Sequence, residues 1–208
     1  MKPTERSDHL QSIRKNTRRM AALMEELLLL GSLDAGKTEL RLAPLELQTF
    51  VQKLVDEVLS AANRRCPIEL SFAEMPAEIQ ADERLLQHIF TNLLTNAIKY
   101  SDAGQMVGFE IRCTGMEMVC TIRDQGIGIP EADQEWLFSA FHRGHNVFGR
   151  PGTGLGLVIV KRCVDLHRGK ITVESKIGQG TVVTVRLPIF CSESVAVARD
   201  VSLTSHNA

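Results

Sequence analysis

The stretch DERLLQHIFTNLLTNAIKYS, residues 82–101, decides the fold because it combines an apolar helix face with two neutral amides. Apolar residues recur in it every three or four positions, which predicts one buried face. That face comprises Leu85, Leu86, Ile89, Phe90, Leu93, Leu94, Ala97 and Ile98. Asp82 is expected to cap the helix. Asn92, Asn96 and Lys99 lie on another line of the helix surface. Because asparagine is a poor helix former, two asparagines on one line suggest a binding role.

Composition limits the class of function. The chain of 208 residues has 24 basic and 25 acidic side chains, and only 5% of its residues are aromatic. Nucleic-acid-binding domains usually have a basic surplus and stacking residues, so this class is disfavoured. No signal peptide and no apolar run of about 18 residues is visible, which predicts a soluble, cytoplasmic chain whose parent protein can still be membrane-bound. Five scattered cysteines are expected to be reduced.

Upstream, residues 7–35 have a heptad pattern. Its apolar or small positions are Leu10, Ile13, Thr17, Met20, Met24 and Leu27. This spacing predicts a long helix that packs against other helices, and Gly36 is expected to end it. One interpretation is a helix that faces the core of the main domain. We prefer half of a helical hairpin or an oligomer seam, because the pattern precedes the main domain, and we expect any binding pocket to begin well after Ala35.

The main domain, residues 42–188, alternates between short strand patterns and helical patterns. Helices are expected within 45–65, after Pro130 and at 155–167. The expected strands are 67–72, 77–81, 106–113, 117–124, 170–175 and 180–188. Pairs of strands between helices favour an α+β fold, a two-layer sandwich of a mixed sheet with helices on one face. Residues 191–208 have little pattern and are expected to be disordered.

Two motifs have side chains suited to a nucleotide. Carboxamide oxygens such as those of Asn92 and Asn96 suit Mg²⁺, and the ammonium of Lys99 can neutralise phosphate, although two asparagines on a helix are more often surface residues. DQGIGIP, residues 124–130, directly follows a strand. The carboxylate of Asp124 can accept a hydrogen bond from an amino group such as that of adenine. A glycine-rich turn without a ligand is the alternative.

The third motif, GRPGTGLGLVIVKR, residues 149–162, places four glycines before a helix. Glycine-rich backbone at a helix N-terminus can hold phosphate. The segment is not a P-loop, because no GK[ST] follows, and Leu157 interrupts a GxGxxG pattern. Between the second and third motifs, Phe138 and Phe141 can anchor a mobile loop. Its basic residues are His142, Arg143, His145 and Arg150. A lid over a triphosphate is the functional interpretation.

Taken in order, these motifs resemble a known family. NLLTNAIKYS, DQGIGIP, LFSAFHRG, GTGLGLVIVKR and GQGTVVTVRLP resemble the N, G1, F and G2 boxes and the closing hairpin of the sensor histidine kinase ATP-binding domain. Residues 9–37 resemble the second helix of that family's dimerisation hairpin. The resemblance implies a hairpin helix at 1–38, an ATP-binding domain at 39–190 and a tail at 191–208.

The resemblance also implies an activity and its partners. A protein of this family binds Mg²⁺ and ATP, transfers the γ-phosphoryl group to a histidine on a hairpin helix, and passes it to an aspartate of a response regulator. It forms a homodimer through the hairpin helices and binds no nucleic acid. The alternatives are a serine kinase of the anti-sigma type and a non-catalytic interaction module.

By position, the family's pattern assigns roles to individual residues. Asn96 would be the Mg²⁺ ligand, with Asn92 beside it. Lys99 and Arg143 would stabilise the phosphates, and Tyr100 would contact the nucleoside. The adenine-binding and phosphate-binding residues would be Asp124, Gly126, Gly128, Ile129, Gly152, Thr153, Gly154, Leu155, Gly156 and Thr181.

The sequence departs from the family at the acceptor. No string like S-H-[ED]-x-R-x-P occurs, and His9 in SDHLQSIR lacks its acidic and proline neighbours. We therefore expect a kinase fragment that lacks the first hairpin helix; a natural protein without the acceptor is the alternative. Gyrase-type ATPases have glutamate where Asn92 stands. An amide cannot act as a general base, so Asn92 cannot activate water. We therefore expect ATP to bind without being hydrolysed until another nucleophile attacks it.

Overall fold

The structure, a computed structural model, describes residues 3–147 and 152–191, without the side chains of residues 190–191 and of most of residues 3–19. Its main layer is a five-stranded sheet in the order β2-β4-β5-β7-β6. These strands span Ile68–Ala73 (β2), Val107–Thr114 (β4), Glu117–Asp124 (β5), Lys170–Lys176 (β6) and Gly180–Pro188 (β7). Only β2 and β4 are parallel; the other neighbours are antiparallel, so the sheet is mixed, as predicted.

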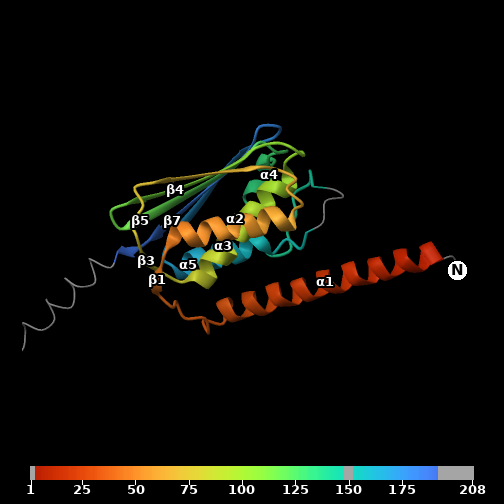
Figure 1. The fold of residues 1–208 in the computed structure, drawn as a ribbon, viewed down its shortest axis with the longest axis horizontal. Helices are drawn as coiled ribbons and strands as arrows, with labels where there is room; N and C mark the ends of the chain where they lie inside the picture. Colours follow the sequence, from red (N-terminus) through yellow and green to blue (C-terminus); the bar gives the residue numbers. More distant parts are fainter. Residues whose placement is uncertain (1–2, 148–151, 192–208) are drawn as a thin grey trace, which may run out of the picture.

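A helical layer covers one face of this sheet (Figure 1). Its helices are α2 (Leu47–Ala61), α3 (Glu83–Tyr100) and α5 (Gly156–Leu166), and a short helix, α4 (Glu131–Gln134), follows Pro130. A second, smaller sheet joins β1 (Ala43–Leu45), β3 (Ile79–Ala81) and β8 (Phe190–Cys191). The α+β prediction is therefore confirmed. The sequence did not indicate β8, and residues 192–208 of the predicted tail lie outside the described residues.

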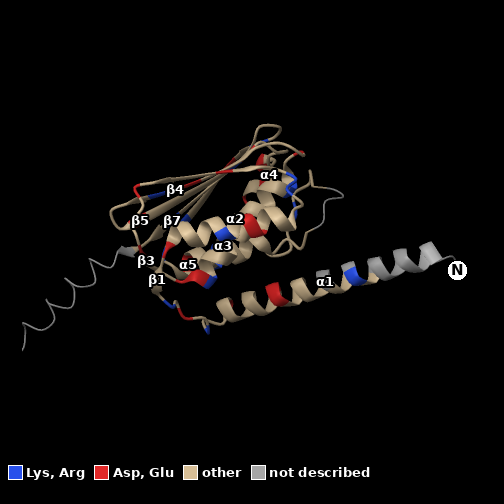
Figure 2. Cartoon of the chain, in the orientation of Figure 1, with Lys and Arg blue, Asp and Glu red and all other residues tan. Residues whose placement is uncertain are grey.

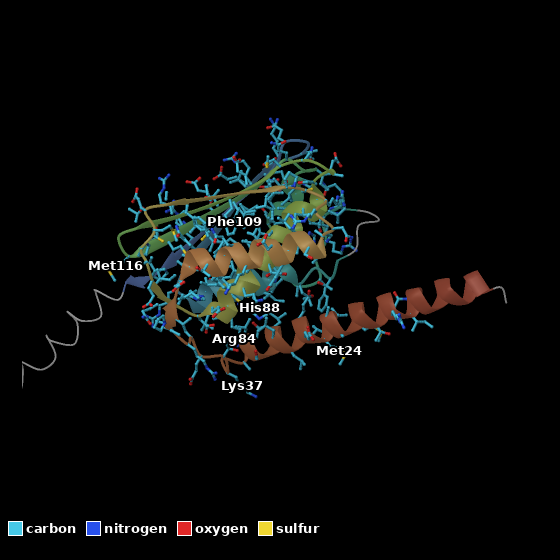
Figure 3. All side chains as sticks on the ribbon, viewed as in Figure 1. Met24, Lys37, Arg84, His88, Phe109 and Met116 are labelled. Carbon is cyan, nitrogen blue, oxygen red and sulfur yellow. The ribbon has the colours of Figure 1, made fainter. Side chains whose placement is uncertain are left out.

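Helix α3 is the centre of the core. Its buried residues are Leu85, Leu86, Ile89, Phe90, Leu93, Leu94, Ala97 and Ile98, the face predicted from spacing. Oδ1 of Asp82 accepts a hydrogen bond of 3.2 Å from the backbone N–H of Leu85, which confirms the predicted cap. The ring of Phe90 packs edge-on against Phe109 of β4, with centroids 5.4 Å apart. Figure 3 shows Phe109 between the sheet and the helices. The core therefore fixes α3, and with it the amide-bearing face, against the sheet.

The long helix α1 (Pro3–Asp34) lies below the helical layer, and its N-terminal part extends away from it (Figure 1). Gly36, at φ 62°, ends the helix; the N–H groups of Gly36 and Lys37 donate to the carbonyls of Leu33 and Ser32. This is the Schellman arrangement that glycine favours.

The predicted seam of α1 is solvent-exposed. The side chains of Ile13, Met20 and Met24 are 60%, 65% and 60% exposed, and Figure 3 shows Met24 on the side away from the rest of the molecule. Leu10 lies outside the described side chains. Four other leucines of α1, namely Leu23, Leu29, Leu30 and Leu33, are partly buried against the core. The helix therefore contacts the main domain without using its heptad seam.

The described cysteines are buried free thiols: Cys66, Cys113, Cys120 and Cys163. Burial raises the pKa of the Cys163 thiol to about 12, so this thiol stays protonated near neutral pH. Among the described residues, no helix is both long and apolar enough to cross a membrane. Figure 2 shows acidic and basic residues interspersed over the elements in view.

Two glycines at the β6–β7 turn provide a matched test of this fold. Gly178 and Gly180 both have positive φ, 72° and 88°, but a Cβ on Gly178 would meet nothing within 4 Å, whereas one on Gly180 would overlap the carbonyl oxygen of Asp124. Backbone strain alone should make Gly178→Ala cost about 1–2 kcal/mol. Strain and overpacking should together make Gly180→Ala cost about 3 kcal/mol or more. Denaturant unfolding measures both; equal losses would contradict the close packing at Gly180.

Candidate functional site

A cavity of about 310 Å³ opens between α3, the inner face of the five-stranded sheet and the residues on either side of the undescribed segment 148–151. This volume falls in the range of small-molecule sites. Most of the predicted site residues line it: Asn92, Asn96, Lys99, Tyr100, Asp124, Gly128, Ile129, Arg143, Gly152, Thr153, Gly154, Gly156 and Thr181. Gly126 and Leu155 were also predicted; both are buried and do not line the cavity.

Asp124 is the last residue of β5 and is only 9% exposed. Its Oδ1 accepts hydrogen bonds from the backbone N–H groups of Gly126, at 2.9 Å, and Thr181, at 3.2 Å. Burial raises the pKa of this carboxyl, and the two N–H groups partly oppose the rise. Because both bonds end on Oδ1, Oδ2 is placed to accept a hydrogen bond from a ligand.

The turn after Asp124 packs too closely for side chains at two positions. A Cβ on Gly126 would overlap the backbone of Tyr100 at the end of α3. A Cβ on Gly128, at φ 67°, would overlap the backbone of Lys176 at the end of β6. The N–H of Ile129 donates to Oγ of Ser175 at 2.9 Å. The two glycines therefore bring the ends of α3 and β6 to the same wall of the cavity.

Side chains of α3 reach across the cavity to the glycine-rich segment before α5. A Cβ on Gly156 would lie 2.7 Å from Oδ1 of Asn92, and one on Gly152 would lie 2.6 Å from Nζ of Lys99. Lys99 also donates to the hydroxyl of Tyr100 at 2.8 Å. The glycines therefore leave room for an amide and an ammonium beside backbone N–H groups at the start of a helix. This combination favours an anion.

Residues 137–147 of the predicted lid are described, and polar contacts hold them to the cavity edge. The buried Asp133 accepts from the backbone N–H of His145 at 2.8 Å and lies 2.6 Å from its Nδ1. The backbone N–H of His145 is the main reason why the pKa of Asp133 is lowered. Nδ2 of Asn146 donates to the carbonyl of Gly128 at 2.8 Å. Arg143 lines the cavity, and its Nη2 donates to the carbonyl of Val147 at 3.4 Å.

Two groups of lining residues were missed by the sequence reasoning. The first forms apolar walls suited to a flat ring: Leu93, Ala97, Ile122, Ile127, Leu137, Val147, Leu157, Val173 and Val183. Strand alternation in β5–β7 was a signal that could have indicated some of them. The second is Glu26 of α1, whose Oε2 accepts a hydrogen bond of 2.7 Å from Oγ1 of Thr153. This contradicts the expectation that the pocket begins after Ala35; no local pattern predicts where a separate helix docks.

The amide oxygens fit a magnesium ion that is bound together with phosphates. The described residues contain no group of three or more His, Cys, Asp or Glu side chains that could hold a metal ion. Mg²⁺ seldom needs such a group, because it keeps several waters and takes one or two protein oxygens plus substrate phosphates. Asn92, beside Gly156, and Asn96 both line the cavity and offer two such oxygens.

Comparison with known proteins relates this chain to histidine kinases. A family described as histidine kinase-, DNA gyrase B- and HSP90-like ATPase matches residues 81–190. The circadian input-output histidine kinase CikA of Synechococcus elongatus is 31% identical over 89% of this chain. The sensor histidine kinase RppB of Synechocystis is 35% identical over 87%, and the histidine-protein kinase BarA of Escherichia coli is 35% identical over 86%. The matches cover 25%, 40% and 20% of these proteins, so the chain spans two fifths of their length at most.

Solved structures agree with this relationship. Full-length ShkA, crystallised in complex with AMPPNP, has a TM-score of 0.78 and 25% identity over 90% of this chain and 40% of its own. The histidine kinase AdeS of Acinetobacter baumannii shares the fold, with a TM-score of 0.70 and 22% identity over 86% of this chain and 83% of its own. The chain therefore belongs to the histidine kinase-, DNA gyrase B- and HSP90-like ATPase family and contains an ATP-binding domain of the sensor histidine kinase type.

Proposed function

We propose that this chain binds ATP with Mg²⁺ and donates the γ-phosphoryl group to a protein histidine. The observation that carries the proposal is one cavity whose lining combines a buried carboxylate with cations and backbone donors. Asp124 provides the acceptor, and Lys99, Arg143 and the segment 152–156 provide cations and backbone donors. An adenine base and a triphosphate chain together need this combination of groups.

At the phosphate end, positioning and charge do the chemistry. Lys99 reaches Gly152 from α3, and Arg143 faces the cavity from the lid. The N-terminus of α5 adds a partial positive charge. Asn96 would hold the magnesium ion, which supplies further neutralisation of phosphate charge when it is bound. Transfer of a phosphoryl group depends mainly on such positioning and stabilisation.

Asn92 explains why this site would retain ATP rather than hydrolyse it. Its Nδ2 donates to the carbonyl of His88 at 2.8 Å, which turns Oδ1 towards Gly156. An amide has no proton affinity near neutral pH, so it cannot activate water as a carboxylate does. The acceptor would be a histidine on a hairpin helix that this sequence does not contain, and the next acceptor an aspartate of a response regulator receiver domain.

The same proposal assigns α1 to homodimerisation. Its exposed residues Ile13, Met20 and Met24 form an apolar stripe, and burial of such side chains contributes about 1.5–3 kcal/mol each. In a hairpin, this stripe would pack against the first hairpin helix and a second copy of the chain. We also propose a cytoplasmic location, because the substrate would be ATP and the described cysteines are free thiols, as is usual in a reducing compartment.

Two other functions make different predictions. A serine kinase of the anti-sigma type would use the same nucleotide but phosphorylate a protein serine, giving an acid-stable product. A non-catalytic interaction module would bind nucleotide weakly. The tight packing around Gly126, Gly128 and Gly152 favours a site that still holds a ligand.

Asp124→Asn tests the adenine end. The asparagine retains an oxygen for the N–H groups of Gly126 and Thr181 but places an NH₂ donor where Oδ2 faced the cavity. A buried charged hydrogen bond contributes about 1.5–3 kcal/mol, so ATP affinity should fall about ten- to a hundredfold. Calorimetry with ATP and GTP measures this; the wild-type chain should bind GTP poorly.

The neighbouring Gln125 is exposed and provides the matched control. Gln125→Ala should leave ATP affinity within about twofold. Equal affinities of the wild-type chain for ATP and GTP would refute the assignment of Asp124 to the adenine amino group.

The absence of a base at Asn92 predicts slow chemistry. With γ-labelled ATP, the chain should bind nucleotide, release little phosphate and remain unlabelled. Asn92→Glu should raise ATP hydrolysis about a hundredfold or more, the usual contribution of a general base. Acid-labile, base-stable label on His9 would contradict the assignment of the acceptor to another helix, and rapid hydrolysis by the wild-type chain would contradict the role of Asn92.

A further inference from the structure

The C-terminal half of α1 contributes a carboxylate to the cavity that we assign to ATP. Glu26 is half-buried and accepts the hydrogen bond of 2.7 Å from Oγ1 of Thr153. Its neighbour Glu25 is exposed. An acidic side chain beside a triphosphate site is unfavourable unless it has a separate role, because like charges repel.

Thr153 connects this carboxylate to the start of α5. Its Oγ1 accepts a hydrogen bond of 3.2 Å from the backbone N–H of Leu155, the residue before the first turn of α5. Helix N-termini carry a partial positive charge that favours an anion. Lys99 reaches the same segment at Gly152. The Glu26 carboxylate therefore lies beside the cation and donors that we assign to the phosphates.

Other contacts of α1 hold Glu26 in this position. Leu23, Leu30 and Leu33 lie three or four residues apart on the same helix face as Glu26, and they are partly buried against the core. At the end of the helix, Asp34 forms an ion pair with Nε of Arg162 of α5, at 2.8 Å. The carboxylate consequently reaches the cavity only while this part of α1 is docked on α5.

We propose that Glu26 is an internal competitor for the phosphate subsite, so that ATP binding and docking of α1 on α5 oppose one another. The inference rests on the function proposed above. A bound triphosphate would take the donors beside Thr153 and repel the carboxylate, which weakens the attachment of α1. Because coupling between two binding events is reciprocal, a docked α1 weakens ATP binding by the same factor. The position of α1 would then report whether nucleotide is bound.

Glu26→Gln tests the competition through charge alone. The amide has the same shape and can still accept from Thr153, but it does not repel phosphate. Calorimetry should show that ATP binds about tenfold more tightly than to the wild-type chain, the effect of removing one nearby charge in a partly screened site. The gain in affinity for ADP should be smaller, and the affinity for adenosine should not change. Glu25→Gln removes the same charge from the exposed neighbour and should change none of the three affinities.

Arg162→Ala tests the docking without altering the cavity. It removes the ion pair with Asp34 on the outside of α5, so α1 should detach more easily. ATP affinity should rise severalfold, and adenosine affinity should stay the same. In the wild-type chain, amide hydrogen exchange over residues 23–34 should become faster when ATP is added, and adenosine should have no such effect.

The outcomes separate the two proposals. If the wild-type chain does not bind ATP, both proposals fail. If it binds ATP but Glu26→Gln gives no gain, or the same gain for all three ligands, only the competition is overturned. A loss of ATP affinity in Glu26→Gln would also overturn it, because the carboxylate would then be a ligand of the magnesium ion.

Discussion

The buried carboxylate of Asp124 is the constraint on which the fold and the site both depend. It stands at the end of the central strand β5, opposite Thr181 of β7, and accepts from the backbone of Thr181 and of Gly126. A buried charge is unfavourable unless it is hydrogen-bonded. The strand pairing and the turn after β5 supply those bonds, and they also fix the direction of the second carboxylate oxygen. The same interactions therefore stabilise the ends of β5 and β7 and orient the recognition group.

The shape of the rest of the cavity depends on four glycines, which have no side chain. Gly126 and Gly128 let backbone segments meet at one wall, and Gly152 and Gly156 leave room for Lys99 and Asn92 at the other. A methyl group at any of these positions would have to displace backbone or a functional side chain. The glycines thus determine the shape of the site, and α3 supplies the amides and the ammonium at this wall.

The sequence predicted the elements whose signals are local. The apolar spacing of α3, the cap at Asp82 and the glycine motifs specified the helix face and most of the cavity lining. Strand β8 and the role of Glu26 were not predicted. Both depend on contacts between distant parts of the chain: β8 pairs with β3, and Glu26 meets a threonine 127 residues later. The heptad seam of α1 was visible, but its spacing does not show which face docks on the main domain.

The most direct test of the central claim is a crystal structure of the chain with a non-hydrolysable ATP analogue and Mg²⁺. The account predicts that the adenine amino group lies within hydrogen-bonding distance of Asp124 and that the phosphates lie along residues 152–156, with the metal ion beside Asn96. A nucleotide bound outside this cavity would contradict the account, as would a reversed orientation with the phosphates at Asp124.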